Sequence, residues 1–151
     1  LLSYYVKLKK PVLLMQILKW FDKPQDLIKF PAKGAIFYIF GVLLSVLLYD
    51  IKIASASIMI LAVGDSMAHI IGRYYGKKKL IINKKKLLEG TLAGTFFGTI
   101  AASFFVPVPF AFFGAMSGML IEAVEINFIH WDDNFSIPLI SGLVMSLMLL
   151  I

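Results

Sequence analysis

Residues 53–73 read IASASIMILAVGDSMAHIIGR, an apolar stretch that ends in a carboxylate, two glycines and an arginine. From Ile53 to Ile71 the apolar residues fall on all sides of a helix and leave no face for water. A carboxylate at membrane depth is expensive and usually functional, so Asp65 is the first candidate site residue. The stretch therefore predicts a membrane-spanning helix that carries a functional acid near one end.

The composition of the whole chain also indicates a membrane protein. Of its 151 residues 60% are hydrophobic, and the mean hydropathy is +0.86, above the range of soluble domains. The absence of cysteine excludes disulfides, thiolate metal sites and cysteine nucleophiles. The sequence contains no P-loop, dinucleotide-binding fingerprint or protein-kinase catalytic loop, which excludes the soluble phosphotransferase folds. Because the chain begins with leucine and lacks a secretory signal pattern, we expect further residues upstream.

We predict an all-α, polytopic membrane protein with about five transmembrane helices. The expected spans are residues 35–48, 53–71, 91–106, 110–129 and 137–151. Residues 1–33 carry seven lysines among apolar and aromatic side chains, which favours an amphipathic helix on the bilayer surface. The alternative is a spanning helix at residues 11–20, which would rise only about 15 Å in a hydrocarbon core of about 30 Å. The predicted organisation is an interfacial segment, 1–33, and a transmembrane domain, 34–151.

Fourteen of the fifteen basic residues fall in two clusters, seven within residues 1–33 and seven in a polar loop at 72–90. The alternation of spans puts both clusters on one side, which the positive-inside rule assigns to the cytoplasm. One arginine against fourteen lysines, with abundant isoleucine, hints at a prokaryotic source. We therefore expect a prokaryotic cytoplasmic membrane protein whose site faces the cytoplasm. The lysines at 77–79 suit either substrate phosphates or anionic lipid.

Acidic residues from separate stretches are predicted to meet on the same side. Asp65 lies near the end of one span, and an Asp-Asp-Asn turn at 132–134 follows another. Glu122 and Glu125 share a helical face and, as neighbouring anions, need a lysine, a proton or Mg²⁺ between or beside them. Cations beside acids at a membrane edge suit a metal-bound polyanion such as a nucleoside triphosphate. The alternative for Asp65 is an interfacial ion pair with Arg73 or a lysine.

Histidines, glycines and threonines are interpreted structurally. His69 and His130 are each isolated in the sequence and are read as interfacial or core residues rather than as ligands or bases. Glycines at 90, 94 and 98 alternate with threonines at 91, 95 and 99, and further glycines stand at 114 and 118. These spacings favour close helix packing, and we assign them no chemistry.

Three blocks of this sequence resemble the integral-membrane polyprenol, dolichol and diacylglycerol kinase family, which is related to the CDP-lipid synthases. The first runs from Gly64-Asp65 through Ala68 and Gly72 to Gly76 (G-D-x-x-A-x-x-x-G-x-x-x-G), the second from Lys86 through Glu89-Gly90 to Ala93 (K-[ST]-x-E-G-x-x-A), and the third from Glu122 through Asp132-Asp133-Asn134 to Pro138 (E…D-D-N…P). The resemblance covers most of residues 30–151. Leu87 stands where the family usually has Ser or Thr, and the family's N-terminal R-K-x-x-H helix is not recognisable.

The resemblance implies a CTP-dependent, Mg²⁺-dependent kinase that phosphorylates the hydroxyl of a membrane lipid: a polyprenol, a phytol-like prenyl alcohol or diacylglycerol. On this hypothesis the catalytic residues are Asp65, Glu122 and Asp133; the Mg²⁺ ligands come from Asp65, Glu122, Asp132 and Asp133; and the nucleotide-binding residues are Gly64, Gly72, Arg73, Gly76, Lys77, Lys86, Glu89, Gly90 and Asn134. The expected partners are the lipid alcohol, CTP and the bilayer, with a homodimer as a further hypothesis and no nucleic acid.

Two alternatives stay open at this point. A CDP-lipid synthase uses the same donor but takes a lipid phosphate as acceptor and releases pyrophosphate. A non-enzymatic ion or proton pathway would use Asp65, Glu122 and Glu125 as membrane acids.

Overall fold

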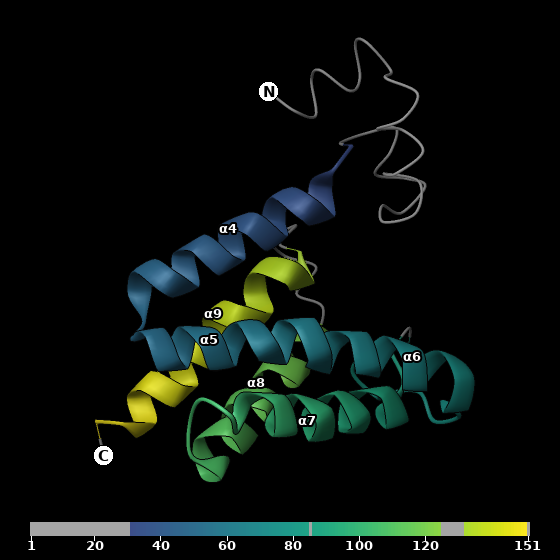
Figure 1. Ribbon diagram of the computed structural model, residues 1–151. Helices are drawn as coiled ribbons and strands as arrows, with labels where there is room; N and C mark the ends of the chain where they lie inside the picture. The colour runs from purple at the N-terminus through teal and green to yellow at the C-terminus, as the bar shows by residue number, and fades with distance from the viewer. Residues whose placement is uncertain (1–30, 85, 125–131, 151) are drawn as a thin grey trace. The chain divides into compact units, whose positions relative to one another are not determined.

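The computed structural model describes residues 31–84, 86–124 and 132–150, and the named elements in these ranges are all helices (Figure 1). They are α4 (Lys33–Leu48), α5 (Ile51–Met59), the π-helix η1 (Ile60–Asp65), α6 (Ser66–Tyr75), α7 (Leu88–Ala102), α8 (Val108–Val124) and α9 (Asp133–Met148). Because α5, η1 and α6 follow without a break, the described chain forms five helical rods, which confirms the all-helical prediction. The predicted interfacial helix falls almost wholly outside the described residues.

The chain divides into two compact units, Leu1–Phe40 and Gly41–Ile151. The division falls inside α4, which runs unbroken from Lys33 to Leu48, and the boundary between residues 33 and 34 stays a prediction. The described part of the first unit is residues 31–40. The site described below lies in the second unit.

The rod Ile51–Tyr75 contains the stretch with which the sequence analysis began. It starts at Asp50, whose carboxylate accepts a hydrogen bond from the Lys52 amide at 3.0 Å and caps α5. By length and composition this 25-residue rod is the one helix in the described ranges that suffices to cross a membrane; α4, α8 and α9 are apolar but shorter. Its middle, η1, is a π-helix that the helical pattern did not predict, and such turns are frequent at functional sites.

The core of the second unit lies where η1, α8 and α9 pack together. Ile60, Met119, Ile137 and Met145 are fully buried there. Completely buried alanines of α5, α7 and α8 lie around them, so the helices approach closely. The core is thus built from a few large side chains among many small ones.

Glycines set the distance between α7 and its neighbours η1, α6 and α8. A Cβ at Gly94 would lie 2.9 Å from the Gly64 carbonyl oxygen and 2.5 Å from Met119 Sδ. A Cβ at Gly90 would lie 2.7 Å from the Ala68 carbonyl oxygen. Real Cβ atoms essentially never come so close, so the predicted packing role of these glycines is confirmed.

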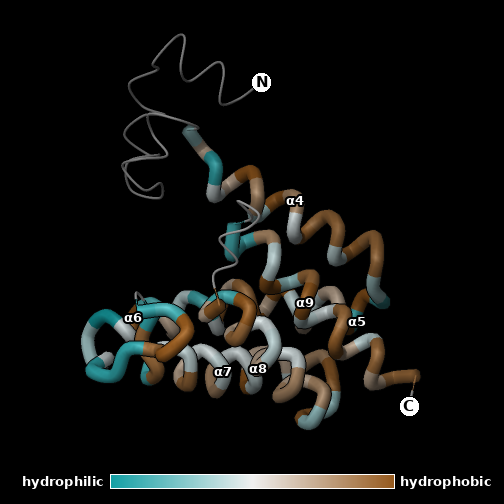
Figure 2. Tube along the Cα trace, turned by 180° about the vertical axis from the view of Figure 1, so that it is seen from behind, coloured by the Kyte–Doolittle hydropathy of each residue, from teal (hydrophilic) through white to brown (hydrophobic). Residues whose placement is uncertain are grey.

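The basic loop is shorter than predicted. Helix α6 continues to Tyr75 and α7 begins at Leu88, so the loop spans residues 76–87 and not 72–90. An antiparallel bridge joins Lys79 to Leu87, and the Leu80 amide donates to the Lys86 carbonyl at 3.0 Å. The loop thereby folds back on itself and presents Lys86 just before α7. Hydrophilic residues gather around α6 and this loop (Figure 2).

Candidate functional site

Charged side chains from four parts of the chain meet near the loop. Asp65 ends η1, Lys86 lies in the loop, Glu122 belongs to α8, and Asp133 begins α9. Lys86 Nζ donates a hydrogen bond to Glu122 Oε1 and lies 3.5 Å from Asp133 Oδ2. Ligand atoms of Asp65, His69 and Glu122 all lie within 4.8 Å of one another. The structure therefore brings together acids that are far apart in the sequence.

The ion pair of Lys86 and Glu122 lies at the centre of this cluster. The Glu122 side chain is 4% exposed and that of Lys86 is 18% exposed. Burial lowers the pKa of Lys86, but the charges of Glu122 and Asp133 together raise it further, so the net shift is upward from 10.5. Lys86 is therefore a cation at neutral pH. The lysine expected as one possible cation beside Glu122 is found there. Glu125 lies outside the described residues.

Two buried carboxylate oxygens, Asp65 Oδ1 and Glu122 Oε2, have no hydrogen-bond partner within the described part of the chain. His69 Nε2 lies 3.3 Å from Asp65 Oδ1, within ion-pair range but without the geometry of a hydrogen bond. A buried acceptor left without a hydrogen bond costs about 1–3 kcal/mol. These oxygens thus have lone pairs available for a ligand.

The unpartnered oxygens fit a hard divalent cation. Mg²⁺ prefers carboxylate oxygens and completes its coordination with water and phosphate. Asp65 and Glu122, two members of the predicted metal set, belong to the three-residue group, and the third member is His69. His69 had been interpreted as an isolated residue. The four-residue step from Asp65 puts His69 on the same helical face, so the sequence carried this signal although His69 was not counted as a ligand.

The predicted residues of the turn at 132–134 divide between two roles. Asp132 Oδ1 accepts hydrogen bonds from the Asn134 amide at 3.3 Å and from Asn134 Nδ2 at 2.9 Å, so Asp132 caps α9. Asp133 instead faces Lys86. Of the two aspartates, Asp133 is thus the one in the charged cluster.

A polar pocket of about 210 Å³ opens beside the cluster. Its lining residues are Ala68, His69, Gly72, Arg73, Lys86, Leu87, Gly90, Thr91 and Glu122. Gly72 and Gly90 are buried against each other at its wall, where a Cβ at Gly90 would lie 3.1 Å from Gly72 Cα. The pocket is smaller than the roughly 300–1,000 Å³ typical of whole-ligand sites, so its size suits a phosphate chain.

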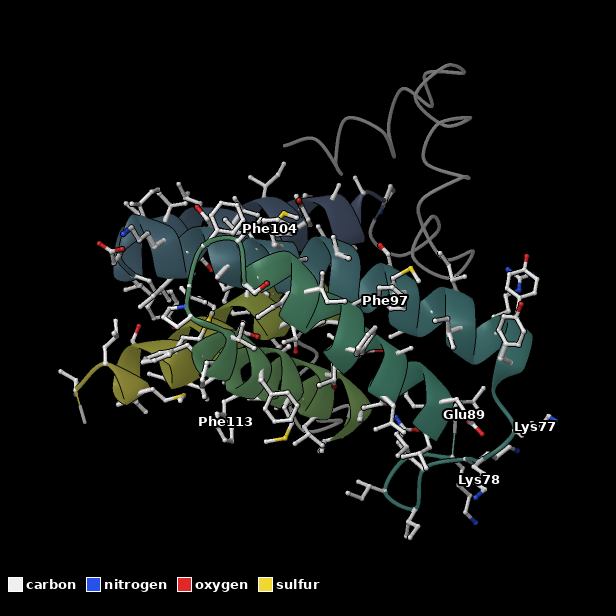
Figure 3. All side chains as sticks on the ribbon, turned by 60° about the horizontal axis from the view of Figure 1, so that its bottom comes forward. Lys77, Lys78, Glu89, Phe97, Phe104 and Phe113 are labelled. Carbon is white, nitrogen blue, oxygen red and sulfur yellow. The ribbon has the colours of Figure 1, made fainter. Side chains whose placement is uncertain are left out.

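Other predicted residues lie at the edge of the pocket or beyond it. Lys77 is exposed on the loop, and both carboxylate oxygens of Glu89 accept from the Lys78 amide, at 3.1 and 3.2 Å (Figure 3). Glu89 thus holds the loop and does not join the acids of the cluster. Gly76 ends α6, and a Cβ there would lie 2.5 Å from Leu87 Cδ1, so this glycine has a packing reason of its own.

An apolar groove of about 500 Å³ runs between α7 and α8. Its lining residues are Leu80, Ile82, Leu88, Thr91, Leu92, Thr95, Phe96, Thr99, Ile100, Phe112, Met116, Leu120, Ala123 and Val124. The hydroxyls of Thr91, Thr95 and Thr99 donate to carbonyls four residues earlier at 3.4, 2.9 and 2.7 Å, so the groove wall stays apolar. The threonines had been predicted to pack against another helix and instead line this groove.

Comparison with known proteins identifies relatives. The chain is 28% identical to a probable chloroplastic phytol kinase of Zea mays, covering 95% of this chain and 52% of that protein. It is 25% identical to CTP-dependent diacylglycerol kinase 1 of Eremothecium gossypii, over 74% of this chain and 43% of that protein. It is 36% identical to an uncharacterized protein of Methanocaldococcus jannaschii, over 76% of this chain and 58% of that protein.

The chain spans about half the length of the curated relatives it matches. No family model matches, and no solved structure matches. The sequence is thus related to proteins named as phytol kinases and as a CTP-dependent diacylglycerol kinase, which confirms the resemblance seen in its three motifs.

Proposed function

We propose that this relative of the phytol and diacylglycerol kinases is itself a membrane lipid kinase, which transfers the γ-phosphoryl group of CTP to the hydroxyl of a lipid. The observation that carries the proposal is the cluster of Asp65, Lys86, Glu122 and Asp133, in which two buried carboxylate oxygens accept no hydrogen bond from the described residues. The cluster lies beside a polar pocket whose volume suits a phosphate chain. Thr91 lines both this pocket and the apolar groove.

The exposed apolar surface supports a membrane location. Phe104 is 81% exposed, Leu47 is 70% exposed and Phe96 is 61% exposed, each on a different helix or connection. Many further large apolar side chains are exposed as well, and soluble monomers rarely leave extensive apolar surface in water. Together with the long apolar rod Ile51–Tyr75, this surface favours the predicted polytopic arrangement. The plant relatives are named as chloroplastic, so they give no support to the expected prokaryotic membrane, and the homodimer stays a prediction.

In the proposed site each charged residue has a distinct role. Asp65 and Glu122 supply the oxygens that would hold Mg²⁺, with Asp133 beside them. The bound ion would neutralise phosphate charge during transfer. Lys86 is positively charged at neutral pH because its pKa is raised. It lines the same pocket and would bind a phosphate oxygen. Arg73, at the exposed side of the pocket, would bind a second one.

The reaction we propose is an in-line displacement. The lipid oxygen forms a bond to the γ-phosphorus while the bond from that phosphorus to the β,γ-bridging oxygen breaks. The nucleoside diphosphate leaves, and the hydroxyl proton passes to a carboxylate of the cluster. CTP as donor is supported by the name of one relative, the diacylglycerol kinase of Eremothecium gossypii.

The Asp65→Asn variant tests the proposal. The protein in detergent micelles would be supplied with Mg²⁺, a lipid alcohol and CTP labelled in its γ-phosphate, with ATP in parallel. We expect labelled lipid phosphate from the wild type and at least about a hundredfold less from the variant, since a ligand that organises transition-state charge is lost. Asp50→Asn is the matched control, because Asp50 caps α5 and takes no part in the cluster.

Three results would contradict the proposal. The first is normal turnover in Asp65→Asn, which would remove Asp65 from the site. The second is release of pyrophosphate in place of nucleoside diphosphate, which would indicate the CDP-lipid synthase reaction. The third is ion flux through the wild type without nucleotide consumption.

A further inference from the structure

We infer that the apolar groove between α7 and α8 binds the acceptor lipid, that its occupant has a single long hydrocarbon chain, and that the hydroxyl end lies at Thr91. This inference rests on the proposed lipid kinase function and adds where the acceptor binds and of what kind it is. The distinguishing observation is that Thr91 lines both the groove and the polar pocket.

The two cavities also meet on α8. Glu122 lines the polar pocket, and the next residue, Ala123, lines the groove. Glu122 is 4% exposed, and its Oε2 has no hydrogen-bond partner among the described residues. A hydroxyl group at this junction would therefore lie beside an available carboxylate oxygen. The groove is thus apolar along its length and has the Glu122 carboxylate at this end. This arrangement fits a lipid alcohol, which has an apolar chain and a reactive hydroxyl at one end.

The length of the groove matches one lipid chain. Its lining extends along α7 from Leu88 to Ile100 and along α8 from Val124 to Phe112. At about 1.5 Å per residue each wall rises about 18 Å. One leaflet of a hydrocarbon core of about 30 Å is about 15 Å deep, which is the depth that a lipid tail occupies. A chain with its hydroxyl at Thr91 would thus extend through one leaflet beside α7.

The chemistry of the wall favours a hydrocarbon occupant. The three threonine hydroxyls are bonded within α7, so they offer no donor that an apolar chain would leave unsatisfied. Leu92 and Phe96 on the rim are 60% and 61% exposed, so the groove is open along its side and a lipid would enter laterally from the bilayer. Because the groove lies between two helices and has a volume of about 500 Å³, we assign one hydrocarbon chain to it, whereas diacylglycerol has two.

Photolabelling of the wild-type protein tests the location without requiring turnover. The probe is a long-chain prenyl alcohol with a photoreactive group at the end of its chain, added to the protein in detergent micelles. We expect the label on peptides that contain the far end of the groove, Thr99–Ile100 or Phe112–Met116, and its loss when excess unlabelled prenyl alcohol competes. Label confined to other helices, or label that does not respond to competition, overturns the inference.

A chain-length series tests the same point through activity. Thr99→Phe places a ring at the far end of the groove, so the ratio of long-chain to short-chain prenyl alcohol turnover should fall on the order of tenfold. Leu143→Phe, on the exposed side of α9, is the control and should leave this ratio unchanged. Met116→Phe fills the groove from the opposite wall and gives an independent variant should Thr99→Phe not fold.

The outcomes separate the inference from the function on which it rests. Equal chain-length ratios in both folded groove variants and the wild type overturn the groove as the acceptor site, as does a preference for diacylglycerol that neither variant alters. Competed label in the groove without turnover of any alcohol supports the groove and contradicts the kinase.

Discussion

The two faces of α7 differ in the size of their side chains and in their burial, although residues of the two faces alternate along the same helix. The face with Gly90, Gly94 and Gly98 is buried against η1, α6 and α8 at backbone contact distance. The other face, with Leu92 and Phe96, remains exposed along the apolar groove. Small residues thus fix the position of the helix, whereas large ones leave space for a ligand. The charged cluster lies where the two faces meet, at the start of α7, because Gly90 of one face and Thr91 of the other both line the pocket with Lys86 and Glu122.

The largest expected effect comes from adding the same side chain to each face. At Gly94 a leucine meets the Gly64 carbonyl oxygen and Met119, so Gly94→Leu should cost about 3 kcal/mol or more of stability and abolish activity. Thr95→Leu, one residue later, projects into the groove and should cost less than about 1 kcal/mol. Thermal unfolding in detergent gives both values. Similar losses at the two positions would contradict the distinction between the faces.

The next effect concerns the buried ion pair that joins the loop to α8. Lys86→Met leaves Glu122 buried without its cation, and such an uncompensated charge costs about 3 kcal/mol. The cost should be somewhat smaller here, because Lys86 is still 18% exposed. Activity should fall as well, since the proposed phosphate ligand is lost.

The double variant Lys86→Met/Glu122→Gln separates the structural part of this effect from the functional part. Removing the unpaired charge should restore most of the thermal stability. Phosphoryl transfer should stay low, because both substituted residues belong to the proposed site. If the double variant were as unstable as Lys86→Met alone, the ion pair would not be the cause of the loss.

Much of this arrangement could be predicted from the chain, because local patterns determine it. The runs without a polar face predicted five helices in the observed order, and the glycine spacing predicted the close packing of α7. Counting spans predicted that Asp65, the basic loop, Glu89 and the turn at 132–134 share one side, since alternate spans return to the same side. Lys86 of that loop does lie beside Asp133 of that turn, whereas Glu89 binds the Lys78 amide. These features depend on periodicity and topology, which a sequence displays directly.

The remaining features depend on contacts that no local pattern encodes. The π-helical turn η1 lies where Gly64 packs on Gly94 and Gly98. Its conformation therefore depends on the contact with α7 and cannot be read from the sequence of η1 alone. The choice of Lys86 as the partner of Glu122 depends on how the loop folds back between Lys79 and Leu87. The groove escaped prediction for the same reason, because threonines that line a groove and threonines that pack against a helix have the same spacing.

The smallest expected effect is at Leu87, where this chain departs from the pattern it resembles. Leu87 occupies the N-cap position of α7, yet leucine has no oxygen to accept a hydrogen bond from the helix amides. Leu87→Thr and Leu87→Val lose the same leucine contacts with Gly76 and differ from each other by one hydroxyl. The threonine variant should be more stable by about 1 kcal/mol, measured by thermal unfolding, because it supplies the cap. Leu87 also lines the polar pocket, so the same pair of variants shows whether the threonine hydroxyl contributes to nucleotide binding. A lower KM for CTP in the threonine variant than in the valine variant would place this hydroxyl at the phosphates. Equal KM values would limit its role to capping α7, the helix whose glycine face is already held by close packing.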